Sequence, residues 1–214
     1  MKPLKTFDNL SRGKQERITR VAVEEFSEKG YAGASINAMV RRLGIAKGSI
    51  FQYFGDKQGL FLFVFNTAME KVKDYLRTVR DETASEDLFT ALEATLTAGV
   101  IFMQKHPVIY RLYIKTLFED DIPFRSEILR SLREYSFKYF RSLLERAGAR
   151  GEVRRDLDLD KAAFLLDALM DRFLLARTVP HLDGGLGIYG CSDEAARQWI
   201  SEIREMVRNG IGAP

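Results

Sequence analysis

Apolar residues recur every three or four positions along most of this chain, the spacing of helices that bury one face. Between residues 35 and 44 four apolar side chains stand at i, i+3, i+4 and i+7. Ser35 precedes this stripe and can cap a helix N-terminus through its hydroxyl, and Gly44 follows it, where positive φ carries no Cβ penalty. The pattern therefore predicts a short helix whose buried face consists of Ile36, Met39, Val40 and Leu43.

A second short helix is predicted after the turn, beginning at Lys47. Ile50 and Phe54 fall on one side of it, whereas Gly48 and Gln52 fall on the opposite side. Small and polar outward residues can approach base edges and phosphates in a major groove. Two short helices joined by a tight turn, with such an outer face, indicate a helix-turn-helix.

The distribution of charge separates this interpretation from an ordinary helical hairpin, which would also bury one stripe and expose another. Residues 1–57 contain 11 Lys or Arg and 6 Asp or Glu, a net charge of +5. The whole chain carries +3, so residues 58–214 carry −2. A basic N-terminal module on a slightly acidic body is typical of a protein that contacts a phosphate backbone.

The rest of the chain favours an all-α fold, because glycine and proline interrupt helical patterns and no run of alternating β-branched residues occurs. We expect an N-terminal three-helix domain over residues 1–56 and a larger helical domain over residues 57–214. Ser85 is the predicted start of one helix and Gly148 the predicted end of another. The expected helices, besides those of the turn, cover 11–29, 57–79, 85–105, a short stretch to 118, 124–147, 158–178 and a last segment from 192.

The helix over 158–178 carries apolar residues on most of its circumference, so it must be covered on both sides. The last helix has a matching apolar stripe. We interpret the pair as the half of an isologous four-helix interface in a homodimer, although a monomer in which both helices are internal stays open. The candidate interface residues are Phe164, Leu169, Phe173, Trp199 and Ile203.

The helix-turn-helix resembles the TetR-like family of bacterial transcriptional regulators over about the first quarter of the chain. Upstream residues also follow the family's first helix and its exit turn. One departure is Phe51, which stands where the family often has a tyrosine that reaches a phosphate. The matching residues are Ile18, Ala22, Phe26, Gly30, Tyr31, Ser35, Gly44, Ile45, Gly48, Ser49, Ile50, Phe51, Gln52, Tyr53, Phe54 and Lys57.

The resemblance implies a ligand-responsive, sequence-specific DNA-binding regulator, most often a repressor that a small molecule releases from a near-palindromic operator. Gln52 is the candidate for base reading, because its amide can pair with adenine, and Lys47 and Lys57 are candidates for phosphate contacts. The full predicted DNA-binding set is Ser35, Asn37, Lys47, Gly48, Ser49, Phe51, Gln52, Tyr53 and Lys57.

The resemblance also implies that the C-terminal domain binds an effector and forms the dimer. Large apolar and aromatic side chains of the central helices are candidates for the effector pocket, which would suit a largely apolar ligand of unknown identity. These candidates are Phe102, Met103, Tyr110, Tyr113, Phe137 and Phe140.

Other chemistry has little support. The glycines at 185, 187 and 190 spell a dinucleotide motif, but no strand precedes them. The two histidines lack partners at metal-ligand spacing, and a single cysteine excludes a zinc thiolate cluster, so no metal, cofactor or catalytic residue is predicted. No secretion signal or membrane-spanning run is evident, which favours the cytoplasm. An all-α enzyme and a non-specific nucleic-acid-binding module remain the alternatives.

Overall fold

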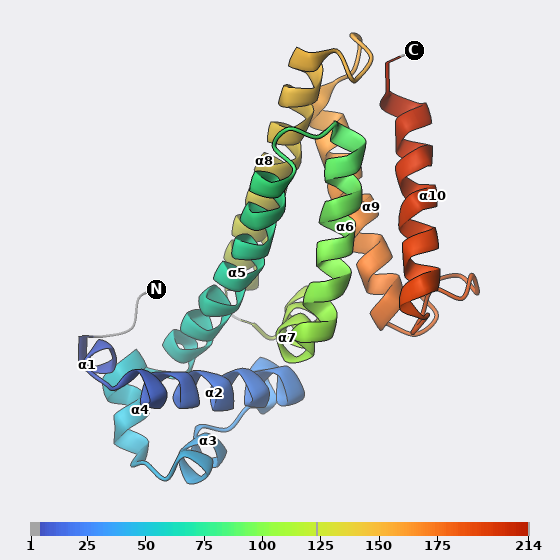
Figure 1. Ribbon diagram of the computed structural model, residues 1–214. Coiled ribbons are helices and arrows are strands. Elements are labelled where there is room, and N and C mark those ends of the chain that lie inside the picture. Colours follow the sequence, from blue (N-terminus) through green and yellow to red (C-terminus); the bar gives the residue numbers. More distant parts are fainter. Residues whose placement is uncertain (1–4, 123, 214) are drawn as a thin grey trace. The chain divides into compact units, whose positions relative to one another are not determined.

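The computed structural model describes residues 5–122 and 124–213, and within these ranges the chain forms helices and no strand, as the all-α prediction requires (Figure 1). One isolated antiparallel bridge pairs Val153 with Gly212. The helices are α1 (Lys5–Asp8), α2 (Arg12–Gly33), α3 (Ile36–Leu43), α4 (Lys47–Phe54), α5 (Lys57–Glu82), α6 (Leu88–Lys105), α7 (Pro107–Phe118), α8 (Arg125–Arg150), α9 (Leu159–Thr178) and α10 (Asp193–Ile211).

The chain folds as two compact units, and each unit consists of two separate stretches of sequence. The first unit comprises the chain up to residue 74 together with residues 103–129, and the second comprises residues 75–102 together with residues from 130 onward. The helices α5, α6 and α8 therefore each contribute residues to both units. The functional boundary expected at residues 56 and 57 remains a prediction.

Aromatic side chains form much of the core of the first unit. Phe26 and Phe61 are buried, and their rings meet edge to face with 5.0 Å between centroids. Phe124, which precedes α8, joins them with its ring centroid 5.8 Å from that of Phe61. In this unit α2 packs against α7 (Figure 1), so the helix-turn-helix is built on a base supplied by α5, α7 and the segment before α8.

The first long helix breaks at the glycine where the sequence predicted its end. It is interrupted at Gly30, which has φ 69° and ψ −179°, and then continues for one more turn to Gly33. The N–H of Ala34 donates to the carbonyl of Gly30 across 3.2 Å, which closes that turn. The predicted end of the first helix at Gly30 is thus confirmed as the point where the helical backbone breaks, and one further helical turn follows it.

The second unit packs parts of α6 and α8 with α9 and α10 around two apolar clusters. One cluster includes Leu92, Phe140 and Leu144, and the other includes Leu96 and Phe173. The helices α9 and α10 begin as predicted, since the side chain of Asp158 accepts from the N–H groups of residues 160 and 161, and that of Ser192 accepts from residue 195.

Two helix ends in this unit differ from the predictions. The helix α6 begins at Leu88 rather than at Ser85, and Asp87 caps it by accepting a hydrogen bond from the N–H of Thr90 across 2.8 Å. The helix α8 continues through Gly148 and ends at Arg150, and Gly151, with φ 71°, provides the left-handed residue that terminates it.

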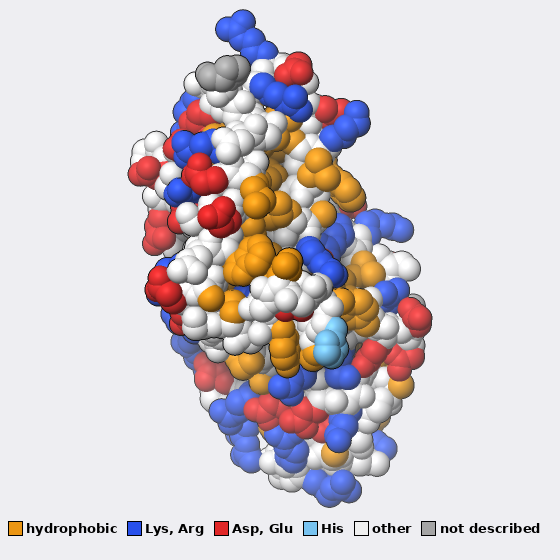
Figure 2. Space-filling model, turned by 90° about the vertical axis from the view of Figure 1, so that its right-hand side faces the viewer, with side chains coloured by type: hydrophobic (Ala, Val, Ile, Leu, Met, Phe, Trp, Pro, Cys, Tyr) orange, Lys and Arg blue, Asp and Glu red, His pale blue; other side chains and the backbone are white. Residues whose placement is uncertain are grey.

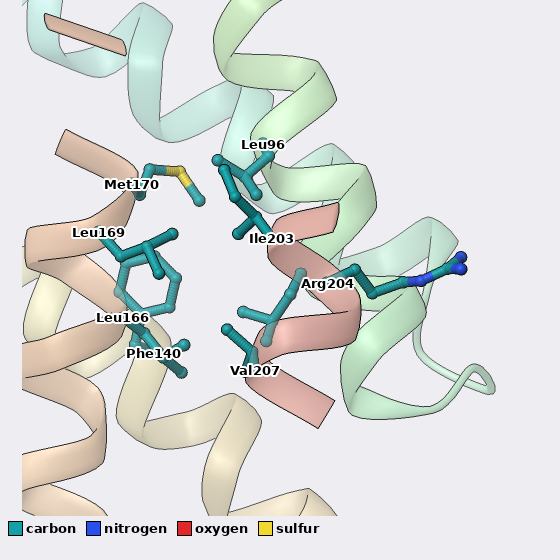
Figure 3. A pocket seen from close by; sticks show the side chains of 9 residues that line it. Leu96, Phe140, Leu166, Leu169, Met170, Ile203, Arg204 and Val207 are labelled. Atoms are coloured by element: carbon teal, nitrogen blue, oxygen red, sulfur yellow. The ribbon is translucent and has the colours of Figure 1, made fainter. Parts of the chain in front are cut away.

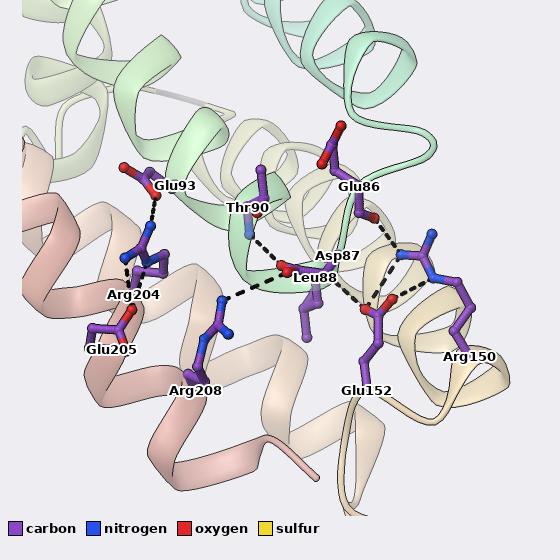
Figure 4. A network of polar contacts seen from close by, with 10 residues as sticks. All are labelled: Glu86, Asp87, Leu88, Thr90, Glu93, Arg150, Glu152, Arg204, Glu205 and Arg208. Atoms are coloured by element: carbon purple, nitrogen blue, oxygen red, sulfur yellow. Dashed lines mark hydrogen bonds and ion pairs between the residues drawn. The ribbon is translucent and has the colours of Figure 1, made fainter.

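A polar network explains why α6 starts so late (Figure 4). Glu152, in the connection between α8 and α9, accepts a hydrogen bond from the N–H of Leu88 across 2.8 Å. Arg150 pairs with Glu152 across 2.6 Å and also donates to the carbonyl of Glu86 across 2.7 Å. The first turn of α6 is therefore fixed by residues more than sixty positions away in the sequence.

Candidate nucleic-acid interface

The first helix of the helix-turn-helix is built as the sequence predicted. Ser35 caps α3, and its hydroxyl oxygen accepts from the N–H of Ala38 across 3.3 Å. Glu25 of α2 accepts from the backbone N–H of Ser35 across 3.0 Å, which ties the start of α3 to the first long helix. The apolar stripe of α3 is directed inward, because Met39, Val40 and Leu43 are buried, although Ile36 at its start is only half-buried.

The turn between the two helices uses the conformational freedom of Gly44. This residue adopts the left-handed region, with φ 67° and ψ 35°. The N–H groups of Gly44 and Ile45 return to the carbonyls of Arg41 and Val40 across 3.3 and 3.2 Å, so the orphan carbonyls at the end of α3 are satisfied. The chain then re-enters helix at Lys47, as predicted.

The second helix of the helix-turn-helix, α4, has one buried face and one open face. Ile50 and Phe54 are 1% and 4% exposed, so they anchor the helix to the rest of the unit. Lys47, Gly48 and Gln52 are exposed. Ala46 caps the helix without a side-chain hydrogen bond, and its backbone carbonyl accepts from the N–H of Ser49 across 3.0 Å.

Gly48 has no role in the packing of the protein itself. A Cβ built on it would meet no heavy atom within 4 Å. A glycine inside a helix costs roughly 0.5–1 kcal/mol relative to alanine, so its presence in an eight-residue helix brings no intramolecular benefit. An open, side-chain-free position on the exposed face suits close approach by another molecule.

The other residues of the predicted DNA-binding set that lie around this face differ in their exposure to solvent. Asn37 is exposed on α3, and Phe51 is 40% exposed, with the Lys47 ammonium 6.0 Å from its ring centroid. Ser49 is half-buried, as is Tyr53, whose ring lies 6.0 Å from that of Phe7.

The ammonium group of Lys57 already makes contacts within the protein. Its ammonium donates to the carbonyl of Ala32 across 3.0 Å and lies 5.1 Å from the ring centroid of Tyr31. Burial, and secondarily the Asp56 carboxylate, raises the pKa of the Tyr31 phenol, so the ring beneath Lys57 is neutral. Lys57 therefore joins the start of α5 to the exit of α2, and its predicted phosphate contact would use its remaining donors.

Sequence reasoning missed the residues that hold α4 from outside the helix-turn-helix. The helix α1 packs on α4 through Thr6 and Phe7, but four residues are too few to show a periodic pattern. It also missed Gly59, where a Cβ would collide with the carbonyl oxygen of Phe54. Glycine at that position lets α5 start against the end of the recognition helix.

The six predicted effector residues do not fall in one unit. Met103, Tyr110 and Tyr113 belong to the first unit, whereas Phe102, Phe137 and Phe140 belong to the second. The pocket drawn in Figure 3 lies within the second unit, and of the six it is lined by Phe140. Its other lining residues are Leu92, Leu96, Leu166, Leu169, Met170, Ile203, Arg204 and Val207.

This pocket is apolar but small. Its cavity volume is about 10 Å³, no more than a single water molecule needs. The Arg204 guanidinium at its edge is paired with Glu93 across 2.5 Å and with Glu205 across 2.8 Å. An effector of ordinary size would fit only after the surrounding helices move apart.

The predicted dimer residues separate into surface and core. Phe164 is 64% exposed, and Leu169, Trp199 and Ile203 are half-buried. Phe173 is 4% exposed because it packs inside the second unit's own core, so it offers almost no surface to a partner. Figure 2 shows hydrophobic side chains gathered in a band on the side of the molecule where α9 and α10 lie.

Within the described residues no helix is long and apolar enough to cross a bilayer, and no group of three metal-ligating side chains gathers. The glycines near 185 form a turn after a helix, organised by Asp183, whose carboxylate accepts from the N–H of Ile188 across 3.0 Å. The segment before them, from Leu159 to Thr178, is helix and not the strand that a dinucleotide site needs.

Comparison with known proteins identifies both parts of the chain. Residues 18–64 match the profile described as bacterial regulatory proteins, tetR family, and residues 86–178 match that of a tetracyclin repressor-like C-terminal domain. A TetR family transcriptional regulator from Chloroflexus aurantiacus is 31% identical, with a TM-score of 0.73 and complete coverage of both chains.

Two more distant proteins are similar to this chain, one in sequence and one in fold. The repressor AcnR of Corynebacterium efficiens is 25% identical over 94% of this chain and 93% of its own length. The fatty acid degradation regulator FadR of Bacillus halodurans is 17% identical, with a TM-score of 0.72 over 94% of this chain and 98% of that one, which concerns the fold alone. With a helix-turn-helix of this geometry and matches along both of its domains, the chain belongs to the TetR family of DNA-binding transcriptional regulators.

Proposed function

We propose that the protein is a repressor that binds a near-palindromic operator as a homodimer and is released by a small, largely apolar effector. The observation that carries the DNA-binding part is the two-sided nature of α4. Ile50 and Phe54 are anchored in the core, so the rigidly held opposite face presents Lys47, Gly48 and Gln52 to the solvent. Repression is supported by the relatives described as transcriptional repressors.

In this proposal the residues of α4 divide between reading bases and binding the backbone. Gln52 reads a base, because an exposed amide can pair bidentately with adenine in the major groove. Lys47 binds a phosphate, Ser49 and Tyr53 donate neutral hydrogen bonds to phosphate oxygens, and Ser35 at the start of α3 does the same. The two recognition helices of the dimer would enter successive major grooves, about 34–36 Å apart.

Selection of bound sequences from random duplex DNA supplies the probe for a direct test. On the selected duplex, Gln52→Ala is expected to cost roughly 1–3 kcal/mol and to relax the preference at one base pair. Lys47→Ala is expected to weaken binding to all sequences alike. It should also lower the salt slope, which is the slope of the logarithm of the binding constant against that of the salt concentration, by about 1. If Gln52→Ala leaves both affinity and preference unchanged, the assignment of base reading is wrong.

Release by an effector follows if the ligand binds more tightly to a form whose recognition helices no longer match the operator. Linkage then requires that operator DNA weakens effector binding by the factor by which the effector weakens DNA binding. A screen of apolar compounds by thermal shift, followed by titration with and without the selected duplex, measures that factor. Equal effector affinity in the two titrations would contradict the proposal.

A further inference from the structure

The short helix α1, ahead of the helix-turn-helix, is fastened to the recognition helix by two contacts. The Thr6 hydroxyl donates a hydrogen bond to the backbone carbonyl of Gln52 across 2.8 Å. The ring of Phe7 is 3% exposed, and its centroid lies 4.9 Å from that of Phe54 and 5.0 Å from that of Phe63. Thr6 therefore contacts the last turn of α4, and Phe7 contacts both that turn and the first part of α5.

The carbonyl that Thr6 binds needs a partner from outside its helix. The last four carbonyls of an α-helix have no N–H within the helix to accept from, and α4 ends at Phe54. The N–H of Gly55 satisfies the carbonyl of Phe51 across 2.8 Å. The hydroxyl of Thr6 does the same for Gln52, so it acts as a C-terminal cap supplied by a different helix.

The helix α1 is in turn held by the long helix behind it. The side-chain amide of Gln15 donates to the carbonyls of Phe7, Asp8 and Leu10 across 3.2, 3.1 and 3.0 Å. A helix of four residues has no stability of its own, so these bonds and the burial of Phe7 are what fix it. It thereby bridges the start of α2 and the end of α4.

We propose that α1 is a brace that sets the position of the C-terminal half of the recognition helix, with Thr6 and Phe7 as positioning residues for base discrimination. The inference rests on the proposed role of Gln52. A bidentate amide–base pair depends on the direction of the side chain, and Thr6 fixes the backbone from which that side chain projects. The tetR family profile starts at residue 18, so α1 precedes the region on which family membership was recognised.

The contacts of α1 predict a particular pattern of effects on binding. If the cap is lost, the last turn of α4 frays, and correct pairing of Gln52 then carries an ordering cost. Lys47, at the opposite end of α4, keeps its surroundings. Discrimination between bases should therefore fall, while the salt dependence set by phosphate contacts should stay the same.

The first experiment compares Thr6→Val, which keeps the shape of the side chain but removes the hydroxyl, with Thr6→Ser, which keeps the hydroxyl. The probes are the duplex selected by the wild-type protein and the same duplex changed at the base pair that Gln52→Ala no longer discriminates. We expect Thr6→Val to lower the ratio of the two affinities about two- to tenfold, as for one neutral hydrogen bond, at an unchanged salt slope. Thr6→Ser should retain the wild-type ratio.

A second variant tests the brace away from α4. Gln15→Glu places a carboxylate against the three carbonyls that the amide now binds, so it should loosen α1 and lower the same ratio. Thermal unfolding midpoints measured alongside show whether each variant is fully folded at the assay temperature. For a folded variant, a simple loss of stability would leave the ratio of affinities unchanged.

The outcomes separate this inference from the proposal on which it rests. If Gln52→Ala loses discrimination but Thr6→Val and Gln15→Glu do not, the brace is overturned. If Thr6→Val weakens both duplexes alike and lowers the salt slope, Thr6 contacts phosphate itself and the brace is again overturned. If Gln52→Ala still discriminates between the bases as the wild type does, the proposed role of Gln52 is wrong. The brace is then tested by a repeated selection of random duplexes with Thr6→Val. If that selection returns the wild-type preference at every base pair, the brace is overturned as well.

Discussion

The carboxylate of Glu119 occupies the space that a side chain at Gly30 would need. A Cβ built on Gly30 would collide with both oxygens of that carboxylate, which follows α7 and is paired with Lys115 across 2.7 Å. The second oxygen, Oε2, is buried and has no hydrogen-bond partner among the described residues. This contact fixes the kink of α2 against α7 inside the first unit.

Gly30→Ala should therefore destabilise the protein. Its backbone, with φ 69° and ψ −179°, lies in a region that is essentially restricted to glycine, and such strain costs about 1–3 kcal/mol before the displacement of Glu119 is added. Urea denaturation measures the free energy of unfolding. Gly33→Ala is the matched control, since its Cβ would make an ordinary contact of 3.5 Å with Lys29 and should change stability little.

Gly48→Ala should separate stability from DNA binding. The new methyl group meets nothing in the protein, so the helix should gain roughly 0.5–1 kcal/mol in the free energy of unfolding. The same methyl group projects from the face that we assign to DNA, so affinity for the selected duplex should fall. Gly210→Ala in α10, also open within 4 Å, should give a similar gain in stability with no change in affinity. An unchanged affinity for Gly48→Ala would argue against close approach of DNA at this position.

The cap of α6 predicts a dependence of stability on pH. Burial acts to raise the pKa of Asp87, but hydrogen bonds from the N–H and hydroxyl of Thr90 and the charge of Arg208 outweigh it, so the pKa is lowered. A carboxyl group with a lowered pKa in the folded state stabilises the fold above its unfolded pKa, near 4, and loses that contribution as the pH falls through the folded pKa. The free energy of unfolding of the wild-type protein should thus exceed that of Asp87→Asn by less at acidic pH than at neutral pH.

Urea denaturation of the wild type and of Asp87→Asn at several pH values between 7 and 3 tests this sign. The difference in the free energy of unfolding should be largest at neutral pH and should shrink below about pH 4. Because the Asp87 side chain is 42% exposed, solvent screening keeps the effect modest. A difference that is constant across the series would show that the charge of Asp87 makes no contribution.

The helix ends show which parts of the fold could be predicted from the sequence. Ser35 and Gly44 define α3 through contacts within a few residues, so local pattern was sufficient. The start of α6 was not predictable in this way, because Ser85 and Asp87 can both cap a helix. The choice depends on Glu152, which binds the N–H of Leu88 from 64 positions away.

The same reasoning applies to the candidate site. The exposed and buried faces of α4 follow from helical periodicity, and the structure confirms the inward position of Ile50 and Phe54. The brace by Thr6 and Phe7 depends on tertiary contacts across about 46 residues, which periodicity does not encode. Aromatic content alone likewise gave no location for an effector pocket, because Tyr113 and Phe137 belong to different units.

The exposed apolar residues of α9 and α10 predict a dimer that a single charge should disrupt. Phe164 on α9 and Met206 on α10 are 64% and 67% exposed, and large exposed apolar surfaces mark sites of protein–protein interaction. Burying a carboxylate against the same surface of a second copy would leave an unpaired charge, which is strongly unfavourable. Phe164→Glu should therefore shift the protein from dimer to monomer.

Sedimentation of the wild type and of Phe164→Glu at micromolar concentration measures this shift, and Phe118→Glu is the matched control. Phe118 is 60% exposed but lies on α7, outside the proposed interface, so its variant should stay dimeric. Because a palindromic operator binds both recognition helices at once, Phe164→Glu should lose affinity for the full selected duplex while binding an isolated half-site as the wild type does. A dimer that persists in Phe164→Glu, or a wild-type protein that sediments as a monomer, would place the pairing surface elsewhere or remove it.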